Sequence, residues 1–248
     1  MESRTEREYN SRRNFIRNVT IAGIGSGITL LSAHAGENGK ESESKDASHE
    51  THDDEVAPGE DLMREHGVLK RVLMIYEEDI RRIENNIDLP PECIAAPAGL
   101  IRSFIEDYHE KLEEDFLFPR FKKANKLVDL VDVLIRQHQA GRKVTDITLQ
   151  LSNMQSLKNR NERRTLVGSL REFIRMYSPH EAREDTVLFP AFRELVTAHE
   201  YAALGEDFEK KEQQLFGEDG FEKIVDQVSG IERKLGIYDL DQFTPKMQ

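Results

Sequence analysis

The sequence has one cysteine and no tryptophan. Because Cys93 stands alone, it excludes an intrachain disulfide and a zinc site built from several thiolates. No stretch alternates apolar and polar residues with period two, so β-strands are not expected. Apart from residues 19–33, no apolar run approaches the ~20 residues that a membrane-spanning helix needs. These absences predict a helical protein without covalent cross-links.

The chain is acidic, with a formal net charge of -12, and charged residues make up 33% of it. Residues 1–35 contain five arginines against three glutamates, which leaves a net charge of -14 on the rest. An acidic body disfavours nucleic acid and anionic lipid as partners. The abundance of Glu, Lys, Arg and Leu is typical of long solvated helices.

The first 35 residues resemble a twin-arginine signal peptide. The pair Arg12-Arg13 is followed by an apolar run of small residues over 19–33, and Ala33-His34-Ala35 is typical of a signal-peptidase site. This resemblance implies export of a folded protein, usually one that received its cofactor in the cytoplasm. We therefore predict a periplasmic or other extracytoplasmic protein, which would be membrane-anchored only if the signal is not cleaved.

Residues 36–59 are predicted to be a disordered acidic linker. They are rich in Glu, Ser, Asp, Lys and Gly and almost devoid of large apolar side chains, so they cannot bury enough surface to order themselves. His49 and His52 within this segment are expected to be solvated. The remaining predicted units are a helical domain over 60–195 and a helical extension over 196–248.

One pattern of residues occurs twice in the chain. Residues 109–121 return 71 positions later as residues 180–192, and each copy begins His-x-x-x-Glu and ends with Leu-Phe-Pro-x-Phe. His66 lies 43 residues before the first copy, and His138 lies 42 residues before the second. The duplication thus brings four imidazoles and two carboxylates into one internally symmetric arrangement.

Apolar residues spaced three and four apart predict four helices, at about 62–88, 95–118, 127–156 and 161–189. The fold class expected is all-α, an antiparallel up-down four-helix bundle made of two helical hairpins, with an additional C-terminal helix. That helix, at about 206–235, is expected to pack outside the bundle or to mediate self-association into a homo-oligomer. Pro179 is expected to kink or restart the fourth helix.

The His-x-x-x-Glu spacing predicts a metal site. Residues four apart on a helix differ by about 40° in azimuth and about 6 Å along the axis, so both side chains reach the same interior point. The predicted metal ligands are His66, His109, Glu113, His138, His180 and Glu184. Nitrogen and oxygen ligands without sulfur suit iron, manganese or zinc. The alternative is that each histidine is a satisfied core residue and each glutamate lies at the surface.

The ordered combination of these residues resembles the hemerythrin family, in its branch with HHE cation-binding domains, over about residues 60–195. The resemblance implies a non-haem di-iron centre in which Glu113 and Glu184 bridge two Fe ions, with Mn or Zn as substitutes. It also implies that the centre binds a small gaseous or peroxide ligand, such as O2 or NO, or that the protein senses or stores iron.

Two positions depart from the oxygen-carrying members of that family. Where they have a fifth histidine, this chain has Arg142. Where they place the last carboxylate, this chain has Asp185, but Glu184 is preferred because position +4 faces the same way as the histidine. Glu110 is left open as an extra ligand, and Glu114 and Asp185 are expected to accept hydrogen bonds around the ligands or to lie at the surface.

Three functions fit these residues. A metal-binding protein is preferred. A di-iron redox enzyme (an oxidase, a peroxidase, or an enzyme of NO handling or iron-centre repair) would use the same site, but no general acid or nucleophile accompanies the ligands. A purely structural bundle is the third reading. Tyr76, Tyr108 and Tyr177 are expected to pack in the core, with a place in the pocket as the alternative, and His199 is expected at the surface.

Overall fold

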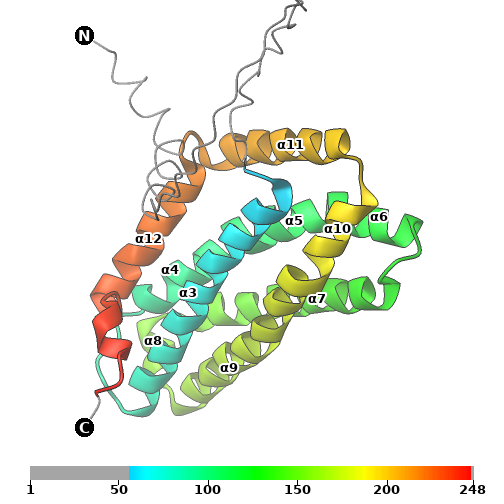
Figure 1. The fold of residues 1–248 in the computed structure, drawn as a ribbon. Helices are drawn as coiled ribbons and strands as arrows, with labels where there is room; N and C mark the ends of the chain where they lie inside the picture. Colours follow the sequence, from blue (N-terminus) through cyan, green and yellow to red (C-terminus); the bar gives the residue numbers. More distant parts are fainter. Residues whose placement is uncertain (1–55, 247–248) are drawn as a thin grey trace, which may run out of the picture. The chain divides into compact units, whose positions relative to one another are not determined.

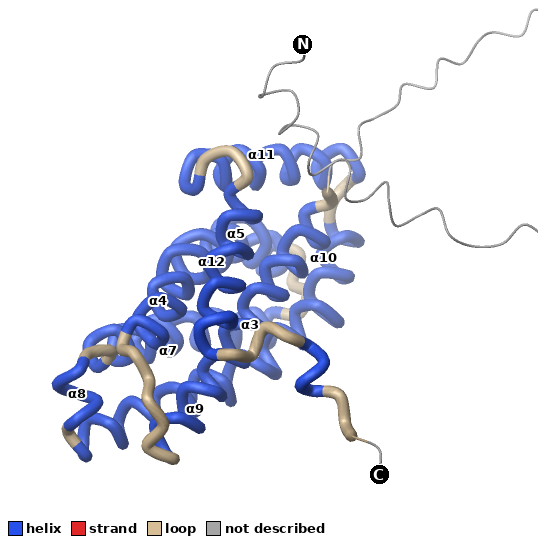
Figure 2. Tube along the Cα trace, turned by 90° about the vertical axis from the view of Figure 1, so that its left-hand side faces the viewer, coloured by secondary structure: helices blue, strands red, loops and turns tan. Residues whose placement is uncertain are grey.

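The computed structural model describes residues 56–246. The predicted signal over 1–35, His49 and His52 lie outside the described residues, as does most of the predicted linker. Within 56–246 every regular element is a helix and no strand is present, as Figure 2 shows. The all-α class is therefore confirmed for this part of the chain. No helix among these residues is both long enough and apolar enough to cross a bilayer.

The helices follow one another with few intervening residues. In chain order they are α3 (Pro58–Glu84), α4 (Glu92–Leu100), the π-helical η1 (Ile101–His109), α5 (Glu110–Leu112), the π-helical η2 (Glu113–Leu117), α6 (Phe118–Lys123), α7 (Val128–Leu151), α8 (Met154–Lys158), α9 (Arg160–Arg183), the π-helical η3 (Glu184–Leu188), α10 (Phe189–Leu195), α11 (Ala198–Phe216), α12 (Gly220–Leu235) and the 3-10 turn η4 (Leu240–Phe243). The stretches 92–123 and 160–195 are each continuous helix that changes its hydrogen-bond pattern along the way.

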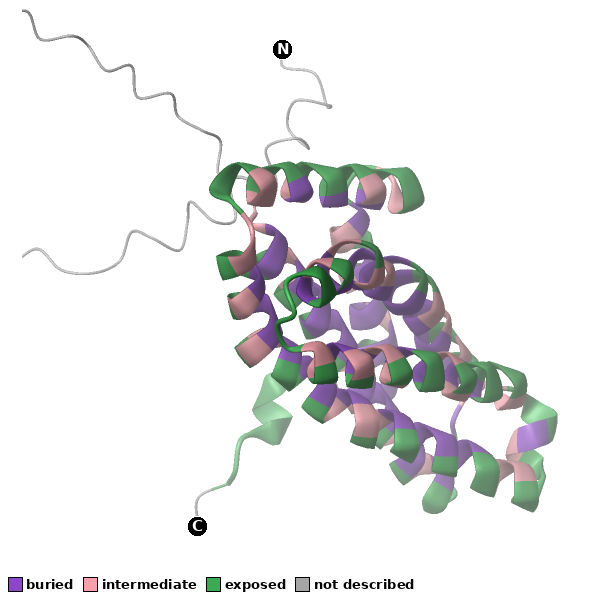
Figure 3. Cartoon of the chain, turned by 90° about the vertical axis from the view of Figure 1, so that its right-hand side faces the viewer, coloured by how far each residue is buried: buried purple, intermediate pink, exposed green. Residues whose placement is uncertain are grey.

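The helical bundle has a shared interior (Figure 1). Helix α3 packs against α9, α9 against α7, and α7 against α4 and η1, which in turn contact α3. The residues that recur at intervals of three and four along α3 are all buried, namely Leu62, His66, Leu69, Leu73, Tyr76, Ile80 and Ile83. Figure 3 shows the buried surface of the helices turned towards this interior and the exposed surface turned away.

The two π-helical turns η2 and η3 fall on the repeated motif. In both copies a phenylalanine donates its N–H to the carbonyl five residues earlier, Phe118 to Glu113 and Phe189 to Glu184. The next residue in each copy is a proline, which has no N–H to continue the α-helical ladder. Single π turns of this kind occur frequently at functional sites.

Several predicted boundaries differ from the structure. Helix α3 begins at Pro58, inside the predicted linker, because proline is well suited to the first helical turn. Pro179 lies inside α9, so the fourth helix does not restart there. The C-terminal region, predicted to hold at least one helix at about 206–235, holds two, α11 and α12. Gly217 (φ 76°) ends α11 and Asp219 (φ 56°) precedes α12, both with positive φ.

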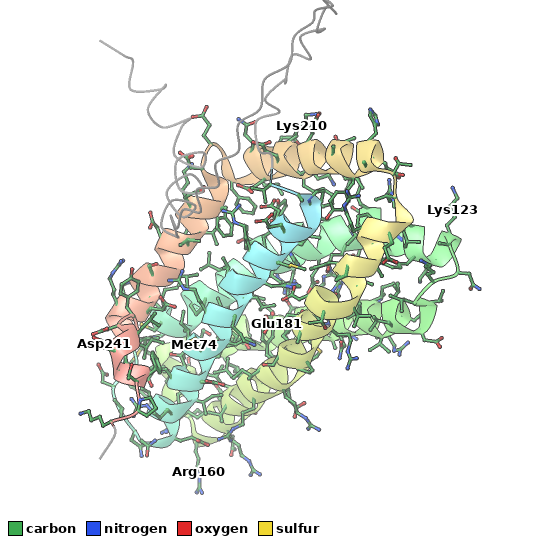
Figure 4. All side chains as sticks on the ribbon, viewed as in Figure 1. Met74, Lys123, Arg160, Glu181, Lys210 and Asp241 are labelled. Atoms are coloured by element: carbon green, nitrogen blue, oxygen red, sulfur yellow. The ribbon has the colours of Figure 1, made fainter. Side chains whose placement is uncertain are left out.

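Helices α11 and α12 cover the bundle from outside. Helix α12 packs along α3 and α4, and α11 crosses the end of the bundle where α3 begins (Figure 1). Their apolar faces are buried through Leu204, Phe208, Ile224, Val228 and Ile231. In Figure 4 the labelled Lys210 lies on the outer side of α11. This extension therefore closes one end of the interior that holds the candidate site.

Candidate metal centre

The six predicted ligand side chains meet inside the bundle. They come from α3, α7, α9 and the three π-helical segments η1, η2 and η3, and each is at most 4% exposed. In one group, one donor atom each of His66, His109 and Glu113 lies within 4.8 Å of the other two. In a second group, the same holds for one donor atom each of His138, His180 and Glu184. The two copies of the motif thus supply matching donor groups.

The imidazoles face each other in pairs. The Nε2 atoms of His66 and His109 are 3.0 Å apart, and those of His138 and His180 are 3.3 Å apart. Two nitrogens bound at right angles to one cation, each at about 2.1 Å, would be about 3.0 Å apart. Each pair therefore has the spacing of two neighbouring ligands on a single metal ion.

Both glutamates reach both imidazole pairs. Glu184 Oε2 lies 3.4 Å from His66 Nε2 and 3.1 Å from His180 Nε2. Glu113 Oε2 lies 3.8 Å from His109 Nε2 and 3.5 Å from His138 Nε2. Each carboxylate is therefore placed between the two pairs, where it could bridge two cations.

The two carboxyl groups are buried next to the imidazoles. Neither oxygen of Glu113 or of Glu184 has a hydrogen-bond partner among the described residues, and both side chains are fully buried. Burial, and then the charge of Glu184, raise the pKa of Glu113 well above its ordinary value. Although burial opposes ionisation of Glu184, the imidazoles of His180 and His66 hold its pKa well below the usual range. A cation pair would let both carboxylates ionise.

Every imidazole is oriented by an acceptor on its outer nitrogen. The four Nδ1 contacts are His66 to Asp185 (2.7 Å), His109 to Glu65 (2.6 Å), His138 to Glu114 (3.1 Å) and His180 to Gln137 (2.9 Å). An acceptor at Nδ1 keeps the proton there and leaves the Nε2 lone pair pointing inward.

These acceptors were predicted only in part. Glu114 and Asp185 act as acceptors, one of the two roles predicted for them. Glu65 and Gln137 were missed, although each directly precedes the lone histidine of its half in the sequence. Their equivalent places in the duplication are the signal that identifies them.

Comparisons with known proteins agree with this geometry. The family model of the hemerythrin HHE cation binding domain matches residues 57–146. Residues 57–146 therefore carry a hemerythrin HHE domain. Uncharacterized proteins of Mycobacterium bovis and of Mycobacterium tuberculosis are each 44% identical to it over 227 residues, which cover 92% of this chain and 89% of theirs. No solved structure matches the chain. The presence of this domain implies that the protein binds a metal cation.

The HHE family match ends within α7, so His180 and Glu184 lie beyond it. They enter the donor groups through the internal duplication and through the geometry of α9 and η3. His199, which has no counterpart in the duplication, is exposed, as predicted.

A polar network borders the HHE site beside His138. Tyr177 Oη donates to Glu110 at 2.6 Å, and Arg142 contacts both Glu110 and Glu114 at 2.8 Å. Burial raises the pKa of Glu110 to about 8. Arg142, at the position of the fifth histidine in oxygen carriers, therefore pairs with acidic groups around the site. Of the other two tyrosines, Tyr76 packs edge-on against Phe173 and Tyr108 lies beside Glu65.

Gly141 makes room for the Tyr177 hydroxyl in this network. A Cβ atom at position 141 would lie 2.1 Å from Tyr177 Oη. We expect Gly141→Ala to displace Tyr177 and to destabilise the protein by about 1–3 kcal/mol in denaturant unfolding. Combining it with Tyr177→Phe, which removes the hydroxyl, is expected to restore part of the loss.

Gly168→Ala on α9 is the matched control, because no described atom lies within 4 Å of its Cβ position. It is expected to stabilise the protein by roughly 0.5–1 kcal/mol, since alanine is the better helix former. Equal stability of Gly141→Ala and Gly168→Ala would show that the Tyr177 hydroxyl does not occupy this space.

Proposed function

We propose that this chain is an exported non-haem di-iron protein that binds a small ligand such as O2 or NO, or that senses or stores iron. Its metal ligands would be His66, His109, Glu113, His138, His180 and Glu184. One observation carries the proposal. Two pairs of imidazoles face inward, and the carboxyl groups of Glu113 and Glu184 lie between the two pairs. Manganese or zinc would suit the same nitrogen and oxygen donors.

The donor set fits a metal pair. Four buried carboxylate oxygens without hydrogen-bond partners in the described part of the chain would be costly as bare charges. Two dications would neutralise them and use the lone pairs that the Nδ1 acceptors leave on the imidazoles. Iron bound there would supply an open coordination position for a small ligand and a change of redox state.

The protein's own residues would shield that ligand from water. The ring of Phe189 stacks on His66 at 5.4 Å, and the ring of Phe118 stacks on His138 at 5.6 Å. These are the two phenylalanines of the repeated Leu-Phe-Pro segments, so each half covers one imidazole with an apolar ring. A site enclosed in this way suits a small gas or a peroxide.

The domain that holds the centre would be an antiparallel up-down four-helix bundle. Contacts between α3 and α9 support opposite directions, because Glu84 pairs with Arg171 while Lys70 pairs with Glu181 (labelled in Figure 4). The contacts of Arg102 with Asp146 and of Glu106 with Thr145 likewise support opposite directions for η1 and α7. Export would follow from the signal in residues 1–35, and the acidic body makes nucleic acid an unsuitable partner.

Metal analysis of natively exported protein tests the proposal. We expect about two irons per chain in the proposed centre, with oxo-bridge absorption in the oxidised protein that is lost when a chemical reductant such as dithionite is added. Replacing one ligand in each pair, as in His109→Gln with His138→Gln, is expected to abolish that absorption. His199→Gln is the matched control, because His199 is exposed. Protein that contains no metal and takes up no iron would refute the assignment.

A di-iron redox enzyme is the second candidate. One observation favours it, because a buried carboxyl and a phenol, Glu110 and Tyr177, lie beside His138. Such groups could hold a proton next to a reacting ligand. Turnover of peroxide or NO beyond one equivalent per chain would favour the enzyme, whereas stoichiometric binding alone would favour the carrier or sensor.

A further inference from the structure

A second group of buried carboxylates lies outside the six-ligand centre. Asp61 and Glu65 on α3 and Glu212 on α11 each place an oxygen within one 4.8 Å group. The group lies at the end of the bundle where α11 crosses the start of α3 (Figure 1). Glu65 is fully buried and Glu212 is 3% exposed, while the Asp61 side chain is 13% exposed and gives the group an edge towards solvent.

The Tyr108 hydroxyl lies beside this group. Glu65, Asp61 and Glu212 all act on it electrostatically. The hydroxyl is buried. A phenol oxygen that could contribute to cation binding therefore lies near the three carboxyl groups.

Glu65 has one oxygen that the described residues leave without a partner. Its Oε2 accepts from His109 Nδ1 at 2.6 Å, but its Oε1 is buried and accepts no hydrogen bond from any described residue. Leaving such an oxygen unpaired costs free energy. Arg64 lies at the rim of the group, with its Nη1 3.5 Å from Asp61 Oδ1 and its guanidinium 4.4 Å above the ring of Phe221.

The internal duplication supplies a comparison. The counterpart of Glu65 in the second half is Gln137, which orients His180 with a neutral amide oxygen. Orienting an imidazole therefore does not require a carboxylate at this position. Glu65 has a carboxyl group that can ionise, which the amide of its counterpart cannot, and it lies beside two further carboxyl groups.

We propose that Asp61, Glu65 and Glu212 bind a third cation, a hard divalent ion, next to the imidazole pair of His66 and His109. An all-oxygen set of three carboxylates and a nearby hydroxyl suits ions such as Mn²⁺, Fe²⁺ or Ca²⁺. The ion would take up Glu65 Oε1, and Asp61 would face the route by which it enters. The site does not depend on the occupancy of the six-ligand centre.

Mn²⁺ titration with detection of the free ion tests this site. Wild-type protein is expected to bind one equivalent more than Glu212→Gln, because the variant loses one of three anionic ligands. Glutamine keeps an oxygen that can accept the Phe221 N–H, which Glu212 Oε1 accepts at 2.9 Å, so the fold is expected to survive. Glu209→Gln, on the exposed side of α11, is the matched control and is expected to bind as wild type does.

Tb³⁺ luminescence shows whether the cation that Glu212→Gln fails to bind lies beside Tyr108. Tyr108 can sensitise an ion bound next to it, and the chain has no tryptophan that would do so instead. Emission excited through tyrosine is expected in wild type and in His138→Gln, and to need roughly tenfold more Tb³⁺ in Glu212→Gln. Retained emission in His138→Gln separates this site from the six-ligand centre. Equal Mn²⁺ stoichiometry in Glu212→Gln and wild type, or emission that does not depend on Glu212, overturns the proposal in favour of a proton held between these carboxylates.

Discussion

Removing the cations from the six-ligand centre is expected to lower the melting temperature of the protein by roughly 8–16 °C. A ligand present at about a thousand times its dissociation constant stabilises the native state by about 4 kcal/mol, and each kcal/mol corresponds to about 2–4 °C for a domain of this size. The stabilisation is large here because the metal-free centre leaves Glu113 and Glu184 buried side by side without hydrogen-bond partners among the described residues.

Thermal unfolding with and without a chelator measures this effect in the Glu212→Gln background, which removes the contribution of the third site. The double variant Glu113→Gln with Glu184→Gln is the comparison. It keeps the shape of both side chains but loses the charge repulsion, so its metal-free form is expected to be more stable than metal-free wild type. Its melting temperature is also expected to be indifferent to the chelator. A chelator shift of the same size in both proteins would mean that the stabilising cation binds elsewhere.

The grouping of the six donor residues could be predicted from the sequence, because the spacing of residues on a helix determines which of them share a face. His109 and Glu113 are four apart, and so are His180 and Glu184, which places each pair on one face whatever the neighbouring helices do. The duplication then implied that both pairs share one interior. The structure places these side chains in two matching groups at the predicted elements.

The outer acceptors could not be predicted in the same way. Successive residues on a helix differ by about 100° in direction, so Glu65 does not share the face of His66. Only the packing of α3 against η1 shows that Glu65 turns towards His109, and the packing of α7 against α9 does the same for Gln137 and His180. Such contacts depend on the distance and rotation of two helices, which periodicity within one helix does not determine.

The C-terminal extension shows a different limit. The prediction of at least one helix at about 206–235 rested on sparse apolar residues and did not place the break at Gly217, whose positive φ ends α11. A turn of this kind between two helices sends the second helix in a new direction, so α11 and α12 cover different sides of the bundle. As a result Glu212, which had no role in the sequence pattern, lies beside Asp61 and Glu65.

Asp79→Asn is expected to stabilise the protein at about pH 8 by about 4 kcal/mol more than at about pH 5. Asp79 on α3 is fully buried, and neither of its carboxyl oxygens has a hydrogen-bond partner within the described chain. Burial, and then the charge of Glu78, raise the pKa of Asp79 from 3.8 to about 8. The native state therefore holds this proton more tightly than the unfolded chain does.

The sign follows from that difference in proton affinity. Below about pH 4 both states of the wild type are protonated, and the carboxyl does not oppose folding. As the pH rises towards 8, the unfolded chain ionises freely while the native state must keep the proton or bury a charge, so the free energy of unfolding falls. Asparagine has the same size and no such proton, so the variant escapes this loss. Denaturant unfolding at the two pH values, at fixed metal loading, measures it.

Asp88→Asn serves as the matched control, because Asp88 is an exposed aspartate in the loop that follows α3. Its free energy of unfolding is expected to run parallel to that of wild type across the same pH range, since an exposed carboxyl keeps similar surroundings in both states. If Asp79→Asn instead destabilises the protein by the same amount at both pH values, the Asp79 carboxyl must be ionised and paired in the native state. A buried charge with a partner is stabilised by that partner, and losing it would cost free energy at every pH at which it is ionised.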